Sequence, residues 1–468
     1  MPGTFNREQE EAITHKGGPL MVLAGPGSGK TLVITYRVKW LIENAGVHPS
    51  NILVITFTRA AAEEMKKRFF MFDGMENAPV TFGTFHSIFF MILRYAYRYT
   101  AANIIREDVK RRYIKEMTEN MELEIEDENE FLSGIINEIS YIKGEMMSLS
   151  YYHSNNCSDE LFAQIYEGYA KRLREENLID FDDMLVFCYE LLKEREDIRT
   201  LWQNKFQHIL IDEFQDINKV QYEIIRMLAG KGDHLFIVGD DDQSIYKFRG
   251  ANITNILNFE KEYPDAKVVK LEQNYRSCGN ILAAANAVIK HNEGRKDKAL
   301  WTDQGDGEKL VFNQSEDEYM EADRVVNEII RLTANGAQYK DIALLYRTNA
   351  QSRILGEKLV MRGIPHRVYG GQNFYERKEI KDIMAYLKVV NNSTDDTYLR
   401  RIINVPKRGI GDATVDKVAA FAAANDMTLM EAMQIIEQVP GLQRSVAKIS
   451  SFVELIDNRG AGTTQYII

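Results

Sequence analysis

The sequence predicts an α/β fold of parallel sheets with helical insertions, and two observations carry that prediction. Residues 18–60 alternate between apolar runs and a helical pattern, with a glycine-rich loop before the helix. Such a strand–helix–strand unit is typical of a parallel sheet with right-handed crossovers. Residues 101–200 then change to long, charged, helix-forming sequence with the acidic cluster ENMELEIEDENE, which indicates a helical insertion. The length of 468 residues suggests about three domains.

The individual elements follow from short β-branched or apolar runs, each bounded by turn residues. In chain order, the predicted strands are GPLMVLA, NILVITFT, FQHILIDEF, HLFIVGD and AKVVKLEQN. Residues 310–390 repeat an α/β pattern, with strands predicted at KLVFNQ, DIALLYR and HRVYGG. Residues 392–468 are predicted to be helical.

Composition excludes several classes of protein. An apolar content of 45% and a charged content of 27% are those of an ordinary soluble globular protein. The sequence has no signal peptide pattern and no long apolar span, so we expect a cytoplasmic protein without a membrane partner. Its three cysteines, Cys157, Cys188 and Cys278, fit no zinc spacing and are expected to be reduced thiols. The net charge of −11 argues against a nucleic-acid coat protein but leaves room for a local basic or aromatic groove.

The glycine-rich loop AGPGSGKT fits the phosphate-binding P-loop pattern, with Ala24 in place of the first glycine. Its glycines let backbone N–H groups curl around phosphates, and the following helix N-terminus adds a positive field. A plain glycine-rich turn is the alternative, but the strand before the loop and the helix after it favour a nucleotide site. The candidate ATP-binding residues are Ala24, Gly25, Pro26, Gly27, Ser28, Gly29, Lys30 and Thr31. Lys30 would reach the β- and γ-phosphates, and the hydroxyl of Thr31 would bind Mg²⁺.

The run HILIDEFQDIN carries three acids at the end of a predicted buried strand, where bare carboxylates are expensive unless each has a partner. Asp212 directly follows the apolar run and fits the strand-end aspartate that holds Mg²⁺ in P-loop ATPases. Glu213 is placed to orient or deprotonate the attacking water. For Asp216, a carboxylate that caps a local turn and a functional role remain equally open.

These motifs, in this order, resemble the UvrD/PcrA/Rep family of superfamily 1 DNA helicases. DEFQD occurs with VGDDDQSIYKFRGA and LEQNYRS, and the other matching segments extend over nearly the whole chain. They are FNREQ, TFTRAAAEEM, GTFHS, FDDML, ALLYRTNAQSR, YGGQNFYERKEIKD and INVPKRGIG. About ten ordered motifs are far more specific than a lone P-loop, and a P-loop kinase would have no reason to carry GDDDQSIY or TFHS.

The resemblance implies two RecA-like domains, each interrupted by a helical insertion. The implied boundaries are 1–100 and 190–278 for the first RecA-like domain, 101–189 for its insertion, 279–376 for the first part of the second RecA-like domain, and 377–468 for a partial second insertion. Two later family segments, one like His-Ser-x-Lys-Gly-Leu-Glu and one like Val-x-x-Thr-Arg-Ala, are not found. We therefore expect an incomplete second RecA-like domain and a truncated form with poor turnover.

For ATP, the resemblance implies that Gln9 reads the adenine edge and that Tyr275 stacks on the base. It implies that Gln243 senses the γ-phosphate and that Arg276 stabilises the transferring phosphoryl group as an arginine finger does. The alternative, purely structural roles are a half-buried aromatic at a strand end for Tyr275 and a surface ion pair for Arg276. Leu32 departs from the arginine that family members commonly carry after GKT, which bears on affinity for adenine or on selectivity among bases.

For DNA, the resemblance implies aromatic platforms for bases and polar residues near the phosphates, as in sequence-tolerant single-strand binders. The candidates are Phe57, Phe181, Tyr246 and Phe248 for stacking, with His86, Arg59, Arg249, Arg347 and Asn349 near the backbone. Phe57, Phe181 and His86 could instead belong to the core. Lys247 and Phe248 stand where the family usually has Gly and Trp.

The function implied is an ATP-dependent 3′–5′ DNA helicase or translocase that uses Mg²⁺ and ATP in repair or replication. Its expected partners are single-stranded DNA and DNA junctions. We expect a monomer, and the sequence names no protein partner. Two alternatives stay open: the helicase part of a recombination helicase–nuclease, and an ATP-binding, DNA-binding fragment without turnover.

Overall fold

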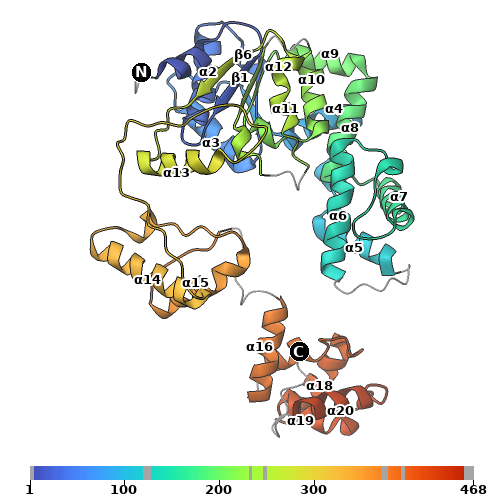
Figure 1. Cartoon of the computed structure of the whole chain (residues 1–468). Coiled ribbons are helices and arrows are strands. Elements are labelled where there is room, and N and C mark those ends of the chain that lie inside the picture. The colour runs from blue at the N-terminus through green and yellow to red at the C-terminus, as the bar shows by residue number, and fades with distance from the viewer. Residues whose placement is uncertain are drawn as a thin grey trace. The chain divides into compact units, whose positions relative to one another are not determined.

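The structure, a computed structural model, describes residues 5–119, 128–230, 234–245, 250–369, 378–391 and 396–457. The chain folds as two compact units, Met1–Leu310 and Val311–Ile468. The first unit contains a sheet with helices around it, and the second is drawn as helices joined by irregular segments (Figure 1). Residues 279–310, which the sequence assigns to the second RecA-like domain, pack with the first unit.

The first unit is built on a six-stranded sheet in which every pairing is parallel, as the sequence predicts. The strand order is β3-β2-β4-β5-β1-β6. The strands are β1 (Leu20–Ala24), β2 (Ile52–Thr56), β3 (Thr81–Thr84), β4 (His208–Ile211), β5 (Leu235–Gly239) and β6 (Lys267–Leu271). Every residue of β1, β2 and β5 is buried, because both faces of the sheet are covered. This explains why these strands are continuous apolar runs rather than alternating ones.

Helices cover the two faces of the sheet, and alternate residues along each strand face opposite layers. Leu23 and Ile55 pack into one apolar cluster, and Val22 and Val54 pack into the other. The helices that share the second cluster are α1 (Arg7–Thr14), α2 (Lys30–Glu43) and α3 (Arg59–Phe70). The first cluster is shared by α4 (Phe85–Tyr97), α8 (Phe181–Glu194), α9 (Glu196–Lys205), α10 (Lys219–Ala229), α11 (Thr254–Leu257) and α12 (Phe259–Glu262). The short helix α13 (Gly279–Ile289) follows β6.

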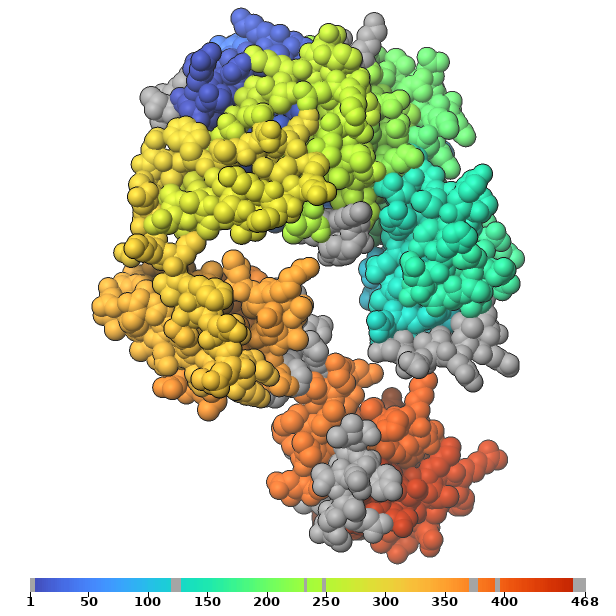
Figure 2. All heavy atoms as spheres, viewed as in Figure 1, coloured from blue at the N-terminus to red at the C-terminus, as the bar shows by residue number. Residues whose placement is uncertain are grey.

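The helical insertion has its own small core, which Figure 2 shows in cyan as a lobe of the first unit. Its helices are α5 (Glu107–Glu119), α6 (Glu128–Glu145) and α7 (Asp159–Glu175). A buried ion cluster joins this lobe to the start of α8. Lys143 Nζ lies 3.1 Å from Asp180 and 2.6 Å from Asp183, and Lys110 Nζ lies 3.2 Å from Asp180. Burial opposes ionisation of Asp180, but the two lysines hold its pKa below the ordinary value. Asp180 is also the N-cap of α8, so the cluster fixes the position of Phe181, the first residue of that helix.

In the second unit, the prediction of strands at KLVFNQ, DIALLYR and HRVYGG is wrong for the residues that the structure describes. Residues 309–314, 341–347 and 366–369 form no ladder there; Gly370 and Gly371 lie outside the described residues. The physical reason is a lack of partners, because a β-prone segment without a neighbouring strand gains no inter-strand hydrogen bonds. Phe312 and Leu345 are accordingly 89% and 96% exposed.

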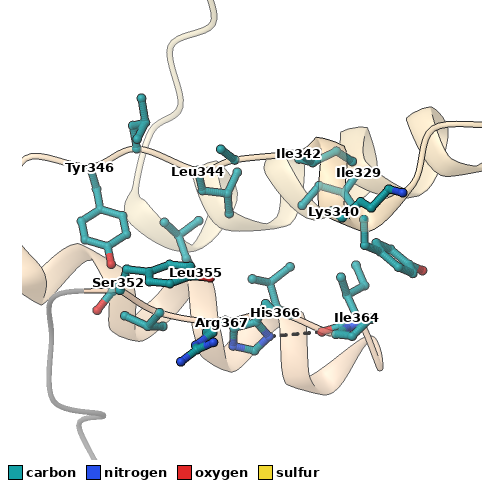
Figure 3. Close-up of a pocket in the computed structure, with 18 of the residues that line it drawn as sticks. Ile329, Lys340, Ile342, Leu344, Tyr346, Ser352, Leu355, Ile364, His366 and Arg367 are labelled. Atoms are coloured by element: carbon teal, nitrogen blue, oxygen red, sulfur yellow. Dashed lines mark hydrogen bonds between the residues drawn. The ribbon is translucent and has the colours of Figure 1, made fainter. Parts of the chain in front are cut away.

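Two helices, α14 (Glu318–Ala334) and α15 (Ser352–Met361), pack together in this part of the second unit through Val326, Ile329 and Leu359. Beside them is a groove of about 870 Å³. Figure 3 shows the side chains that line it from two extended segments: Ile342, Leu344 and Tyr346 on one side, and Ile364, His366 and Arg367 on the other. The groove therefore lies between two of the segments that the sequence predicts as strands.

The described residues of 378–457 form helices, joined by short loops, around a separate apolar core. Their helices are α16 (Lys378–Asn391), α17 (Asp396–Ile402), α18 (Asp412–Ala424), α19 (Leu429–Gln434) and α20 (Val446–Asp457). Across the described part of the chain, every helix is too short or too polar to cross a membrane.

Candidate functional site

The glycine-rich loop connects β1 to α2 and is held in a tight curl. Gly27 and Gly29 have φ angles of +72° and +89°, which side chains with a Cβ rarely adopt. A Cβ at Gly27 would also lie 2.7 Å from the amide nitrogen of Asn274, and one at Gly29 would lie 3.0 Å from that of Gln9. The hydroxyl of Ser28 donates to the carbonyl of Gly25 at 2.7 Å, which closes the loop. The sequence thus needs glycine at these two points for conformation as well as for space.

Lys30 begins α2 and forms an ion pair with Glu213. The Lys30 Nζ atom lies 3.1 Å from Glu213 Oε2. Glu213 has a φ of +51°, which is uncommon for a residue other than glycine and turns the chain sharply after β4. The pairing of a P-loop lysine with an acid from a different strand brings two predicted catalytic residues together.

Asp212 follows β4 and is 5% exposed. Its Oδ2 accepts from the Thr56 hydroxyl at 3.5 Å, while its Oδ1 has no hydrogen-bond partner among the described residues. Burial, and then the neighbouring charge of Glu213, raises the pKa of Asp212 to about 7. A buried carboxylate with an unused oxygen fits a hard divalent cation such as Mg²⁺, which favours oxygen ligands and would favour the ionised form. Thr31, beside Lys30 at the start of α2, would supply a hydroxyl.

Asp216 makes no side-chain cap within the part of the chain that the structure describes. Its Oδ2 is 3.4 Å from Gln215 Nε2, and its Oδ1 is buried without a hydrogen-bond partner there. Burial, followed by Glu213, raises the pKa of Asp216 to about 6. Its acidic group therefore belongs to the same cluster as Asp212 and Glu213.

The predicted adenine-side residues lie against the loop. Gln9 is buried and donates from Nε2 to the Ser28 carbonyl at 3.0 Å, while its Oε1 accepts from the Asn6 backbone N–H at 3.2 Å. The Tyr275 backbone N–H donates to the Gly27 carbonyl at 3.0 Å, and the Tyr275 side chain is 44% exposed. Tyr275 is thus open to a stacking partner rather than part of the core.

Arg276 is exposed. It lies next to the loop, since a Cβ on Gly27 would lie only 2.9 Å from the Arg276 Cβ. Leu32, the position that departs from the family pattern, is 38% exposed on the first turn of α2. Gln243 lies in the turn after β5, where its Nε2 donates to Asp240 Oδ2 at 2.6 Å. These placements put residues from β1, β4, β5 and β6 at one edge of the sheet, since parallel strands present their carboxyl ends together.

The DNA candidates of the first unit include an aromatic pair between two helices. His86 on α4 and Phe181 on α8 meet edge to face, with ring centroids 5.5 Å apart. Phe181 is 45% exposed, so it is not a core residue. Burial lowers the pKa of His86, which favours the neutral ring.

Phe57 and Arg59 lie just beyond β2. Phe57 is half-buried, and Arg59 is exposed and forms an ion pair with Glu63 at 2.8 Å. In the second unit, Arg347 and Asn349 are exposed, and Asn349 lines the groove. Tyr246, Phe248 and Arg249, together with Lys247, lie outside the described residues.

Comparison with known proteins identifies the family. Residues 5–264 match the UvrD/REP helicase N-terminal domain. The chain belongs to the UvrD/REP helicase family. Residues 269–457 match the UvrD-like helicase C-terminal domain, which confirms the resemblance over nearly the whole chain.

Relatives of this UvrD/REP helicase chain include two bacterial proteins named ATP-dependent DNA helicase PcrA. The one from Staphylococcus epidermidis is 43% identical over 463 residues, which cover 97% of this chain and 63% of the relative. The one from Staphylococcus aureus is 42% identical over 467 residues, with the same shares of the two chains. The chain therefore spans less than two thirds of the length of these relatives.

Four residues of this UvrD/REP helicase site were missed in the sequence. Asn274 donates from its Nδ2 to the Pro26 carbonyl at 2.5 Å, and Leu300 lies where a Cβ on Gly25 would fall. Gln215 bridges Glu213 and Asp240, at 2.9 Å from each. Lys298 is buried, with its Nζ 2.9 Å from Asp240 and 2.8 Å from Asp242.

The sequence signals for three of these residues differ in strength. Gln215 and Asn274 lie inside the motifs DEFQD and LEQNYRS, so their motifs pointed to them. Lys298 belongs to the charged run RKDK, which in a sequence reads as a solvated surface.

Proposed function

We propose that the chain binds ATP with Mg²⁺ and hydrolyses it to move 3′ to 5′ along single-stranded DNA, as an ATP-dependent DNA helicase or translocase in repair or replication. The observation that carries the proposal is the meeting of Lys30 with Glu213 at 3.1 Å, next to Asp212, one of whose buried oxygens has no hydrogen-bond partner among the described residues. Membership of the UvrD/REP helicase family and the relatives' name, ATP-dependent DNA helicase PcrA, support the same activity.

The loop residues prepare a cradle for the phosphates. Positive φ angles at Gly27 and Gly29 curl the loop at the N-terminus of α2, where backbone N–H groups and the helix dipole favour an anion. The ammonium of Lys30 would leave Glu213 for the β- and γ-phosphates. That exchange frees the Glu213 carboxylate to accept a proton from the attacking water.

Thr31 and Asp212 are the residues that would hold Mg²⁺. The bound ion supplies positive charge that offsets the charge developing on the phosphoryl oxygens. Asp212 would then stay ionised in its buried position, since a nearby cation favours the charged form.

Gln243 and Arg276 are proposed to contact the γ-phosphate, and Gln9 and Tyr275 the adenine. Gln9 keeps one amide hydrogen and one carbonyl lone pair beyond the hydrogen bonds described above, which is what a base edge requires. The exposed ring of Tyr275 offers a stacking face.

The DNA path is proposed to run over Phe57 and the His86–Phe181 pair, with Arg59 near phosphates. Tyr246, Phe248 and Arg249 are proposed to continue this path, and Arg347 and Asn349 to contact DNA from the second unit. Half-exposed aromatic rings give sequence-independent stacking worth about 1–3 kcal/mol per base.

Steady-state ATP hydrolysis with and without a single-stranded oligonucleotide tests the ATP part of the proposal. We expect DNA-stimulated turnover that Glu213→Gln lowers by about a hundredfold or more, because the general base is lost. The matched control is Glu167→Gln, on the exposed face of α7, which should leave turnover unchanged. Nucleotide and DNA binding without turnover would instead make this chain a binding module.

Oligonucleotide binding tests the DNA part. Phe181→Ala should weaken single-stranded DNA binding by about tenfold, which is one lost stacking contact. Phe312→Ala removes an equally large and more exposed ring from the second unit and serves as the control. Displacement of strands from duplexes with 3′ or 5′ tails then tests polarity, and preference for the 5′ tail would contradict the proposal.

A further inference from the structure

We propose that Gln215 is a positioning residue that couples the hydrolytic carboxylate of Glu213 to the turn Asp240–Gln243. The inference rests on the function proposed above and deepens it. It names the side chain through which occupancy of the nucleotide site would reach the segment after β5, from which the candidate DNA residues Tyr246, Phe248 and Arg249 follow in sequence.

Gln215 is 1% exposed, and both ends of its amide are used. Its Nε2 donates to Glu213 Oε2 at 2.9 Å and lies 3.4 Å from Asp216 Oδ2. Its Oε1 accepts from the Asp240 backbone N–H at 2.9 Å. Because a backbone N–H can only donate and an ionised carboxylate can only accept, the amide can fit in one orientation alone.

The chemistry of these partners demands a neutral group that donates at one end and accepts at the other. A glutamate here would keep the bond to Asp240 but would place a further negative charge against Glu213 and Asp216. A leucine of similar size would lose both bonds. The packing is also tight, because a Cβ on Gly239 would lie 2.8 Å from the Gln215 Oε1 atom.

The far end of the connection is anchored by charge. Asp240 accepts from Gln243 Nε2 at 2.6 Å, and Lys298 Nζ lies 2.9 Å from its other oxygen. Arg295 adds two hydrogen bonds of 2.7 Å to Asp242. These ion pairs hold the turn, and Asp240 binds both Gln215 and Gln243, so we infer that a displacement of Asp240 reaches Gln243.

The near end is held in an unusual conformation. Glu213 has a left-handed backbone and pairs with Lys30, so its carboxylate is fixed by the P-loop on one side and by Gln215 on the other. When phosphates attract Lys30, the carboxylate loses one of its two anchors. The remaining bond to Gln215 then carries the change to Asp240 and Gln243.

The first measurement uses hydrogen–deuterium exchange with a non-hydrolysable ATP analogue. In the wild type, we expect nucleotide to change the exchange of the amides of residues 240–245. In Gln215→Leu, that response should disappear while the analogue still binds. Gln203→Leu is the matched control, because Gln203 donates to the Met227 carbonyl at 2.7 Å in the same unit but away from the nucleotide.

The second measurement compares basal and DNA-stimulated hydrolysis. We expect Gln215→Leu to reduce the stimulation by DNA by about tenfold, in the range usual for coupling between two sites, with a smaller change in the KM for ATP. Gln215→Asn, which keeps the amide but is too short to reach both partners, should show the same loss and covers the case in which the leucine variant fails to fold.

An unchanged exchange response or unchanged stimulation in a folded Gln215 variant would overturn the inference, as would an equal loss in Gln203→Leu. Failure of the proposed function would look different. The wild type would then show no turnover, while the exchange experiment, which needs only nucleotide binding, would still decide the role of Gln215.

Discussion

Two segments with similar sequences adopt different structures in this molecule: one is a buried strand, and the other is a partly exposed extended segment. Residues 52–56 read ILVIT and residues 342–346 read IALLY. The first segment is β2, which pairs with β3 and β4 and is buried at every residue. The second joins no ladder, and its Leu345 is 96% exposed. A β-prone sequence therefore states a preference, and the supply of neighbouring strands decides whether a strand forms.

The same contrast separates the two groups of candidate residues. Apart from Gln9 on α1, the nucleotide residues follow β1, β4, β5 and β6, whose parallel ends meet along one edge of the sheet. Arg347 and Asn349 follow a segment that has no strand partner in the described part of the second unit, so no sheet positions them there. Matched substitutions in the two units test whether this difference in burial is reflected in stability.

The largest expected difference lies between two lysines. Lys143→Met in the first unit removes the lysine partner of the buried Asp183 and one of the two lysine partners of Asp180. The uncompensated buried charge should lower the free energy of unfolding by about 3–5 kcal/mol. Lys358→Met in the second unit removes a 2.7 Å ion pair with Asp323 whose side chains are 22% and 43% exposed, and should cost under about 1 kcal/mol. Urea unfolding of both variants measures the difference. Equal losses would mean that the two units bury charge to a similar degree.

A pair of leucines gives the next largest effect. Leu210 lies in the middle of β4 and is 1% exposed, so Leu210→Ala should cost about 3 kcal/mol by loss of burial and the cavity left behind. Leu345→Ala should change the unfolding free energy by less than about 0.5 kcal/mol, because the side chain is already in solvent. A large loss of stability at Leu345 would show that residues 342–346 are buried in solution, and the contrast with the buried strands of the sheet would then not hold.

The smallest of the three effects is a pH dependence of stability that arises from His208 in the sheet. His208 at the start of β4 stacks on His234, with ring centroids 4.2 Å apart. Burial, then His234 and Arg37, lowers the pKa of His208 to about 4. Between pH 4 and the ordinary value near 6.5, the unfolded chain binds the proton more readily than the folded one. The stability of the first unit is therefore complete above that range and is lost as the pH falls through it.

After allowance for partial exposure, we expect this loss to be about 2 kcal/mol. Thermal unfolding between pH 7 and pH 4 measures it, and His208→Gln should flatten the slope for the first unit alone. A slope that is unchanged in His208→Gln would assign the pH dependence to other groups.

Most of the first unit was predictable because its signals are local. A buried parallel strand is a continuous apolar run, and the glycine loop and the acids after β4 stand at strand ends that the pattern marks. The strand β3, only four residues long and partly exposed, escaped prediction because it lacks that apolar run.

The remaining features depend on contacts between distant residues. The sequence cannot show that Lys298 is buried among three aspartates or that Gln215 reaches Asp240, because these pairs form only when the sheet assembles. The strands predicted in the second unit failed for a different reason: their local pattern is β-prone, but among the described residues no neighbouring strand pairs with them.

The strand order has a consequence for how the protein is made. β1 pairs with β5 and β6, and β2 pairs with β4, so the first two strands to leave the ribosome are not neighbours in the sheet. After β3 is complete at Thr84, the sheet must wait for residues up to Leu271 before its last edge can be added. At typical rates of synthesis this takes about ten to forty seconds. Until β4 emerges β2 lacks one partner, and until β6 emerges β1 lacks one, so apolar strand edges stay exposed on the nascent chain.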